Sequence, residues 1–452
     1  MASGSFAPDL SRGQMIQKPL IPLFTVFLET TRFTNLHMTI PDLRLWQREL
    51  NQELKDILAY WQRYAPDPTN GGFYGAVGYD NLPKPDAAKG VVLNSRILWT
   101  FSAAARHTQH DDQYLPTARR AFEYLDTYFR DRQYGGVYWM VNAKGHPGTA
   151  TDNSKQLYGQ AFAVYGLSEY YHATRHQPAL EFAQEIFRAM VKHAYDPKRG
   201  GFTEAFARDW SEAETYVIAR KANGESKTMN THLHILEAFV SLLRVWPDPA
   251  VKTQVRGLIN NFLDHIIDPK THRMVLFQGD NWEPRRTGIS YGHDIEASWL
   301  LLEAAEVLHE ADLIAKVRKE SVLMARAALS GLDTDGGMNY EYEGIDQNKP
   351  QQSHDTGHWN RERSWWVMAE AMVGFMNAYQ LTKDKTYLTH AANSWDFTKK
   401  HLLDTKNGEW FLGVDATGKV LGNEKINAWK CPYHNGRACI EMMERIGKLI
   451  DR

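Results

Sequence analysis

Two kinds of helical segment alternate along most of the chain. Residues 43–64 carry apolar side chains at helical spacing on one face and charged side chains opposite, which predicts an amphipathic helix. Residues 92–106 are nearly all apolar or small, as expected of a helix that is buried on every side. The pattern recurs, with further amphipathic helices expected near 114–130, 179–194, 250–266, 312–329 and 384–401, and further apolar helices near 155–174, 229–246, 291–309, 363–381 and 435–448.

A short Gly-Gly signal, followed by apolar or aromatic residues, separates the two helices of each pair. It stands at 71–72, 135–136, 200–201 and 336–337, with degenerate copies near 272–274 and 408–410, at intervals of about 64 to 72 residues. Six helix pairs predict an all-α fold, an (α/α)6 barrel with the apolar helices inside and short hairpins over one mouth. An open solenoid of twelve helices would show the same alternation, but it needs polar caps at its ends, and the sequence shows none.

The boundaries of the folded part follow from where this periodicity begins. No linker or charge block divides residues 41–452, so we expect a single catalytic domain there. Residues 1–40 lack helical periodicity, and their apolar run at 19–28 contains prolines and no small-residue cleavage site after it. We therefore expect an N-terminal extension that is poorly structured or loosely packed. A signal peptide, or an extension upstream of a start at Met38, are the alternatives.

Composition narrows the class of partner. A net charge of -2 argues against nucleic acids and anionic membrane surfaces, which require basic patches. The chain contains no run of 18 apolar residues, so we expect no membrane-spanning helix. Cys431 and Cys439 are too few for a disulfide framework and match no metal spacing, so we expect a reducing compartment, the cytoplasm. The 14 tryptophans fit either a large helical core or a pocket floored with rings, as in carbohydrate sites.

The candidate chemical residues stand near the starts of the apolar helices. His293 and Glu296 are three residues apart and share a helix face, so Glu296 is predicted to orient the imidazole. The alternative is a structural histidine beside a glutamate that the helix dipole favours. Asn230 and His234, four apart, share another face, whereas His232 points away. His-x-His suggests a metal site, but the two rings diverge on a helix and no carboxylate completes the ligand spacing.

Three further features point to a pocket. Arg96 interrupts the apolar run 91–105, and a buried arginine is costly unless it is paired or faces a ligand. His434 follows Pro432 at a predicted helix start, near an aromatic ring at Trp429. Of the adjacent Trp365 and Trp366, one is expected to face the pocket and the other the core. The chain has no nucleophile elbow, phosphate loop or dinucleotide fingerprint, which argues against redox cofactors and phosphoryl transfer.

Two long motifs carry a family resemblance. Tyr-Gly-His-Asp-Ile-Glu-Ala-Ser-Trp at 291–299 and Lys-Cys-Pro-Tyr-His-Asn-Gly-Arg-Ala-Cys at 430–439 resemble the N-acylglucosamine 2-epimerase superfamily, and Met-Asn-Thr-His-Leu-His at 229–234 agrees with its disaccharide branch. The resemblance covers about residues 41–448 and implies an (α/α)6 barrel that inverts C2 of the reducing-end glucose in β-1,4-linked disaccharides. It implies catalytic roles for His293 and His434, and substrate binding by Arg96, Tyr158, Asn230, His234, Glu296, Trp366 and Trp429.

The implied reaction suits these residue types. After ring opening, a base removes the proton α to the C1 aldehyde, and the enediolate is reprotonated on the other face. Two histidines can exchange the roles of base and acid, and Arg96 can stabilise the oxyanion. This chemistry requires no cofactor, metal or nucleotide. Reprotonation at C1 would instead give a ketose as a side product.

Other activities remain as alternatives. Mannose isomerisation and N-acylmannosamine epimerisation occur in the same superfamily. Glycoside hydrolysis would use a carboxylate pair, for which Glu296 and Glu362 are the candidate acids. A sugar-binding module would have little need of two acid–base histidines. A small-molecule substrate is expected in each case, and the chain itself is expected to be a monomer or homodimer.

Overall fold

The structure is a computed structural model that describes residues 40–108, 113–286, 288–343 and 357–451. The predicted extension, residues 1–40, lies outside the described residues apart from Ile40, where helix α1 begins. Twelve α-helices alternate between two layers in the described part of the chain. The outer helices are α1 (Ile40–Tyr64), α3 (Leu115–Tyr124), α5 (Gln177–His193), α7 (Pro249–Asn261), α9 (Ala311–Ala328) and α11 (Lys385–His401). The inner helices are α2 (Val91–His107), α4 (Leu157–Thr174), α6 (Met229–Val245), α8 (Tyr291–Leu308), α10 (Trp365–Thr382) and α12 (Tyr433–Ile450).

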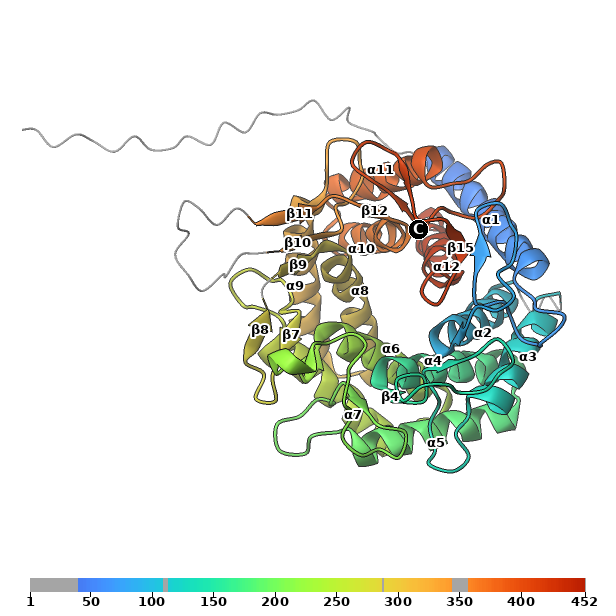
Figure 1. The fold of residues 1–452 in the computed structure, drawn as a ribbon. Helices are drawn as coiled ribbons and strands as arrows, with labels where there is room; N and C mark the ends of the chain where they lie inside the picture. The colour runs from blue at the N-terminus through green and yellow to red at the C-terminus, as the bar shows by residue number, and fades with distance from the viewer. Residues whose placement is uncertain (1–39, 109–112, 287, 344–356, 452) are drawn as a thin grey trace, which may run out of the picture. The chain divides into compact units, whose positions relative to one another are not determined.

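The inner helices form a closed ring (Figure 1). Each packs against the next in chain order, and α12 returns to pack against both α2 and α1. This closure confirms the barrel and excludes the open solenoid. The hydrophobic patterning explains the layers, because α2, α4, α8 and α10 are buried almost throughout. In α1, by contrast, only one face is buried, including Leu50, Leu54 and Trp61.

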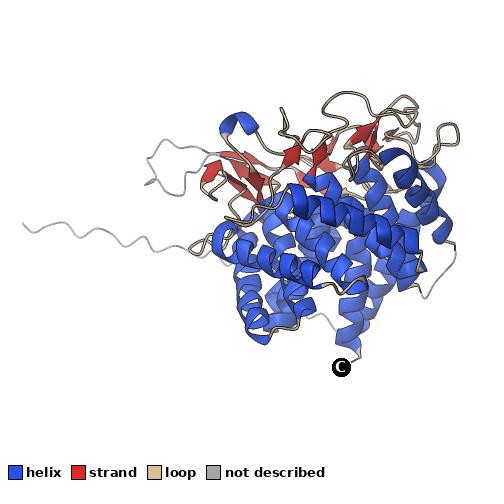
Figure 2. Ribbon diagram, turned by 90° about the horizontal axis from the view of Figure 1, so that it is seen from below, coloured by secondary structure: helices blue, strands red, loops and turns tan. Residues whose placement is uncertain are grey.

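Short strands line one end of the helical ring (Figure 2). The sequence predicted short hairpins or loops over one mouth, and the strands there form such short pairs, six of which join neighbouring repeats. These are β1 (Val77–Gly78) with β15 (Glu424–Ile426), β2 (Lys89–Gly90) with β3 (Met140–Val141), β4 (Lys155–Gln156) with β5 (Ala205–Phe206), β6 (Lys227–Thr228) with β7 (Phe277–Gln278), β9 (Gly288–Ser290) with β10 (Glu341–Glu343), and β12 (Arg363–Ser364) with β13 (Gly413–Val414). Each of the three remaining strands in the described part of the chain pairs with the strand just before it. These are β8 (Pro284–Arg286) with β7, β11 (His358–Asn360) with β10, and β14 (Val420–Leu421) with β13.

The Gly-Gly signals form tight turns just after the outer helices. In the first turn, Gly71 and Gly72 adopt positive φ angles, +76° and +58°, and a Cβ on Gly72 would lie 2.5 Å from the Tyr124 ring. The carboxylate of Asp67 accepts hydrogen bonds from the backbone N–H groups of Thr69 and Asn70 and so closes the turn. An isolated bridge joins the two sides of each turn in all six repeats, as between Pro66 and Phe73.

A buried ion pair ties the first turn to the strand that precedes inner helix α2. The Nζ of Lys89 lies 2.8 Å from Oδ2 of Asp67, and both side chains are almost inaccessible to solvent. We expect Lys89→Met to lower the free energy of unfolding by about 3–5 kcal/mol, because it leaves the Asp67 carboxylate buried without its cation. Urea denaturation followed by circular dichroism measures this change. The matched control is Lys84→Met, whose partner Glu424 forms an exposed pair, and which should change stability by about 0.5 kcal/mol or less.

Candidate active site

A cavity of about 490 Å³ opens at the end of the ring where the strands lie. It is bounded by the N-terminal turns of the inner helices, which explains why the polar residues predicted from the sequence stand at those positions. All nine predicted site residues line it: Arg96, Tyr158, Asn230, His234, His293, Glu296, Trp366, Trp429 and His434. The ring therefore brings together residues that are separated by up to 338 positions in the chain.

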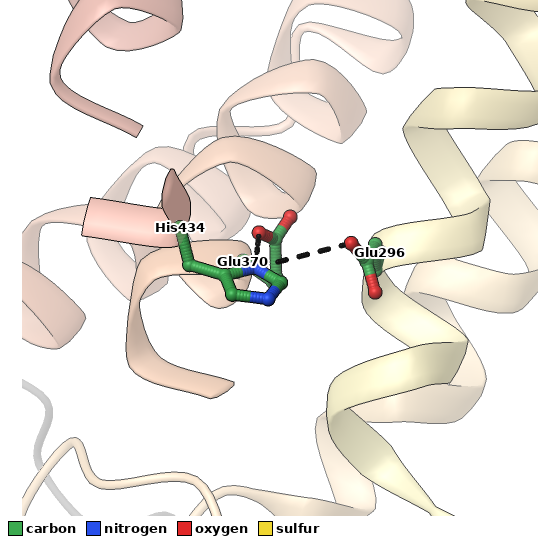
Figure 3. Close-up of side chains that lie close together, drawn as sticks. All are labelled: Glu296, Glu370 and His434. Carbon is green, nitrogen blue, oxygen red and sulfur yellow. Dashed lines mark hydrogen bonds and ion pairs between the residues drawn. The ribbon is translucent and has the colours of Figure 1, made fainter. Parts of the chain in front are cut away.

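His434 is held by a buried carboxylate. Its Nδ1 lies 2.7 Å from Oε1 of Glu370 and 4.0 Å from Oε1 of Glu296 (Figure 3). A proton on Nδ1 is donated to Glu370, which leaves Nε2 as the free nitrogen. Burial lowers the pKa of His434 well below its usual value, and the positive charges of Arg96 and Arg437 lower it further. The imidazole is therefore neutral, as a base requires.

Arg437 lies at the centre of the carboxylates beneath the cavity. Its guanidinium contacts Glu237 and donates hydrogen bonds of 2.7 Å to both Glu296 and Glu370. Burial alone would raise the pKa of Glu237, but Arg437 and His234 outweigh it and lower that pKa to about 2. Burial raises the pKa values of Glu296 and Glu370, and their mutual repulsion raises that of Glu296 further. One arginine thus stabilises three buried acidic side chains.

The same cluster has the residue types of a metal site. Ligand atoms of Glu296, Glu370 and His434 lie within 4.8 Å of one another. The guanidinium of Arg437, however, already bonds both carboxylates, so a bound cation would have to compete with a permanent positive charge. The donor set therefore fits an arginine-centred ion cluster better than a metal centre.

His293 is oriented by a different residue from the one predicted. Its Nδ1 lies 2.7 Å from the hydroxyl of Ser290, whereas the Glu296 carboxylate is bonded to Arg437. The predicted pairing of Glu296 with His293 is therefore wrong, because a cation from across the ring binds the carboxylate and the serine lies beside the imidazole. Burial, with the nearby His234 and Arg96, lowers the pKa of His293 to about 3. This imidazole is neutral as well.

Arg96 is a buried cation that faces the cavity. Only 3% of its surface is exposed, and in the described part of the chain it forms no ion pair with a carboxylate. It donates a 2.9 Å hydrogen bond to the hydroxyl of Tyr158 and a 3.3 Å one to the carbonyl of Trp429, while its Nε has no partner. Such an arrangement is costly unless a ligand compensates it, so Arg96 is suited to bind an electron-rich oxygen.

Further unpaired polar atoms surround the cavity. Oδ1 of Asn230, Oε2 of Glu296 and Nε1 of Trp365 are buried and have no hydrogen-bond partner among the residues that the structure describes. Buried polar atoms normally have partners, so these mark positions where a hydroxylated ligand would bind. Trp429 is 40% exposed, and its ring lies beside those of Trp139 and Tyr158. An exposed ring at a cavity offers an apolar platform for a sugar face.

The two adjacent tryptophans do not divide as expected. Trp365 and Trp366 both line the cavity, so the prediction that one of them faces the core is wrong. The ring of Trp366 lies between the catalytic candidates, with centroids 4.7 Å from His293 and 5.7 Å from His434. The structural role expected for His232 is confirmed, because its Nε2 accepts the N–H of Phe202 and its Nδ1 contacts the carbonyl of Thr228.

Sequence reasoning missed four residues that hold the site together. Glu237 and Glu370 are charged residues in largely apolar inner helices, the same signal that identified Arg96, whereas Arg437 is one of five charged residues in α12 and carried no such signal. Glu237 also stands three residues after His234, and its carboxylate lies 3.0 Å from Nδ1 of that histidine. Ser290 carried a weaker signal, as a serine directly before a predicted helix.

In the described part of the chain, no helix is long and apolar enough to cross a membrane. Cys431 and Cys439 are both buried and free, and the sulfur of Cys431 lies 3.8 Å from a guanidinium nitrogen of Arg96.

Comparison with known proteins places this geometry in a family. A profile of the N-acylglucosamine 2-epimerase family matches residues 72–438. A Bacteroides fragilis protein named cellobiose 2-epimerase is 42% identical over 399 residues, spanning 88% of this chain and 98% of its own. A solved structure of a cellobiose 2-epimerase from Bacillus thermoamylovorans has a TM-score of 0.82 at 38% identity, covering 89% of this chain and 100% of its own. A D-mannose isomerase of Marinomonas mediterranea is 22% identical, over 88% of this chain and 97% of its own. The chain belongs to the N-acylglucosamine 2-epimerase family.

Proposed function

We propose that this protein epimerises C2 of the reducing-end glucose in β-1,4-linked disaccharides, converting cellobiose to glucosyl-mannose and lactose to epilactose. The observation that carries the proposal is the pair of neutral histidines, His293 and His434, which line one cavity together with Arg96, a cation without a carboxylate partner among the described residues. The relatives at 42% and 38% identity, both named cellobiose 2-epimerase, support a disaccharide as the substrate.

The mechanism uses each of these groups for one task. The sugar ring opens, and one histidine removes the C2 proton through its free Nε2, while the electron pair passes to the carbonyl oxygen at C1. The other histidine delivers a proton to the opposite face of C2. Arg96 is positioned to stabilise the developing oxyanion, and the N-terminal ends of the inner helices add positive potential around it. In the reverse direction, the histidines exchange roles.

The low pKa values of the two imidazoles favour their role as a base but make it harder for either one to act as an acid. A neutral histidine is available at neutral pH, but its conjugate acid is unstable in this buried, positively charged environment. Glu370 compensates at His434, because a carboxylate 2.7 Å from Nδ1 stabilises the imidazolium. His293 has only a hydroxyl at that position.

Trp429 is predicted to contribute to affinity more than to chemistry. We expect Trp429→Ala to raise KM for cellobiose about tenfold while kcat falls less than threefold, since stacking with an aromatic ring contributes about 0.5–1.5 kcal/mol. Trp429→Phe, which keeps a ring, should restore most of the affinity. Initial-rate kinetics on both variants measure the split. A fall in kcat with KM unchanged would contradict a stacking role.

The substrate assignment is tested by offering the purified enzyme cellobiose, lactose, mannose and N-acetylmannosamine separately, and separating the products by chromatography. We expect the C2 epimers of the two disaccharides without added nucleotide, with any ketose as a minor product. Fructose from mannose as the main reaction would make the protein a mannose isomerase. Turnover of only the N-acetylated sugar would place it in the acylglucosamine branch, and release of glucose would make it a hydrolase.

A further inference from the structure

Ser290 occupies the N-cap of α8 but does not cap the helix. Its backbone is extended, as at other N-caps, yet its side chain accepts no hydrogen bond from the first turn of α8. Thr228, at the same position of α6, does accept one, from the N–H of Thr231. An N-cap serine normally stabilises its helix by accepting such a hydrogen bond. Here the hydroxyl instead lies 2.7 Å from Nδ1 of His293, and departures of this kind are concentrated at functional sites.

A carboxylate lies behind Ser290. Strand β10 pairs with β9 in antiparallel register, with Glu341 directly opposite Ser290, and the serine side chain hydrogen-bonds the Glu341 carboxylate. Burial and the neighbouring Glu343 raise the pKa of Glu341 to about 7, against the opposing influence of Arg286. Near neutral pH this carboxyl group therefore holds a proton far more readily than the imidazole of His293, whose pKa is lowered to about 3.

Glu341 also faces a second cavity. This cavity, of about 580 Å³, shares His293, Asn230 and Tyr340 with the site cavity, and it is lined on its own side by Glu341, Glu343 and His358. Both Glu343 and His358 are exposed to solvent. Ser290 and Glu341 therefore form a chain of hydrogen-bonding groups that runs from the imidazole to the second cavity.

We propose that Ser290 and Glu341 relay protons between His293 and this second cavity. As Nε2 of His293 takes the proton from C2, its Nδ1 proton passes to the Ser290 oxygen, and the serine hydroxyl proton passes to the Glu341 carboxylate. The electron pair of the broken C–H bond stays on the enediolate. Because His293 gives up its Nδ1 proton as it gains one on Nε2, it remains neutral and no imidazolium accumulates. In the reverse direction Glu341 returns its proton to the serine oxygen, the serine hydroxyl gives its proton to Nδ1, and Nε2 acts as the acid by giving its proton to C2.

The relay also explains how the enzyme can reset. After each inversion by two histidines, the proton has moved from one side of C2 to the other, so the two histidine systems have exchanged protonation states. A proton held on Glu341 can exchange at the second cavity while product occupies the first. Ser290 and Glu341 are thus positioning residues that touch no substrate.

The test compares Glu341→Gln and Ser290→Ala with the wild type in full pH profiles of kcat and KM for cellobiose, since the relay rests on the proposed function. Glutamine can keep the hydrogen bond from Ser290 but cannot take a proton. We expect kcat to fall about 10- to 100-fold in both variants with KM nearly unchanged, and the wild-type inflection near pH 7 to disappear in Glu341→Gln. Ser290→Thr, which keeps the hydroxyl, should recover most of kcat.

Other charged and titratable groups near the relay can also affect the pH profile of kcat. These are Glu343, Arg286 and Glu362 around Glu341, and His234, Glu370 and Arg96 around His293. The matched control is Ser298→Ala, because Ser298 is buried on the same helix and bonds only a backbone carbonyl; its profile should remain that of the wild type. An unchanged inflection in Glu341→Gln, or full activity in Ser290→Ala, would overturn the relay.

A readout without turnover separates the relay from the proposed function. In ¹⁵N-histidine NMR spectra of the free enzyme, we expect His293 to carry its proton on Nδ1 above pH 8 in the wild type. Glu341→Met, which removes the acceptor from Ser290, should move that proton to Nε2. Identical tautomers in both proteins would contradict the relay even if epimerisation is observed, whereas a tautomer change without any epimerisation would sink the proposed reaction alone.

Discussion

Replacing His434 by alanine is expected to lower kcat for cellobiose epimerisation by about 100- to 10,000-fold, the range that acid–base catalysis contributes. The reason is that its Nε2 is the free nitrogen at the cavity, and no other described side chain bonded to Glu370 can exchange a proton with the substrate. His434→Asn is the sharper variant, because the amide can keep the contact with Glu370 without providing a base. Steady-state kinetics by chromatography of the epimer measure both.

The same loss is expected for His293→Ala, since inversion needs a proton donor and acceptor on both sides of C2. Both variants should fold as the wild type does, which circular dichroism and the thermal midpoint can establish. His172→Ala is the control: this half-buried histidine also lies on an inner helix but lines a cavity at the other end of the ring. Wild-type turnover in either active-site variant would rule out the scheme of two histidines.

Arg437→Met is expected to destabilise the fold strongly. It leaves Glu237, Glu296 and Glu370 buried without their shared cation, and removal of one partner from a buried ion cluster costs about 3–5 kcal/mol. Epimerisation should be lost as well, because Glu370 orients His434. Arg437→Lys should recover only part of the stability, since an ammonium group cannot reproduce the planar fork that binds the three carboxylates.

The loss of stability in Arg437→Met should depend on pH in a direction that follows from the pKa of Glu237. In the wild type the pKa of Glu237 is depressed to about 2, so its ionised form stabilises the fold above its unfolded value of about 4.5. Without Arg437 burial raises that pKa, and the folded state then loses stability as pH rises above the unfolded value. The loss in the free energy of unfolding of Arg437→Met, measured by urea denaturation, should therefore be larger at pH 8 than at pH 5.

The control is Arg318→Met, which breaks an exposed pair with Glu306 and should show only a small loss at both pH values. An equal deficit at both pH values in Arg437→Met would contradict the ion-cluster account.

Much of the fold was predictable because it is encoded locally. The two kinds of helix differ in how many faces are apolar, and the Gly-Gly period gives their number and order. The strand pairings were not predictable in the same way. Strands of two or three residues carry no alternation, and their partners are set by which repeats the closed ring places side by side.

The site residues also divide into those that the local sequence identifies and those whose contacts depend on how the ring closes. Arg96 stands out as one charge in an apolar run, and that logic extends to Glu370, the one charged residue of α10, but not to Arg437, whose helix carries four further charges. Which acid meets which histidine could not be read from the chain, because the contacts join different inner helices: 64 positions separate His434 from Glu370, and 141 separate Arg437 from Glu296. The spacing of three between His293 and Glu296 therefore predicted a shared face correctly and the wrong partner.

The most direct test of the central claim is proton NMR of the purified protein with cellobiose in deuterated water, without metal or nucleotide. The proposed mechanism predicts that a mannose reducing-end signal grows while deuterium enters at C2, because the proton that leaves C2 exchanges on the histidines before one returns. Growth of the epimer with the original proton retained at C2 in every turnover would contradict proton transfer through the histidine pair. A spectrum of free glucose, or one that does not change, would contradict the proposed function itself.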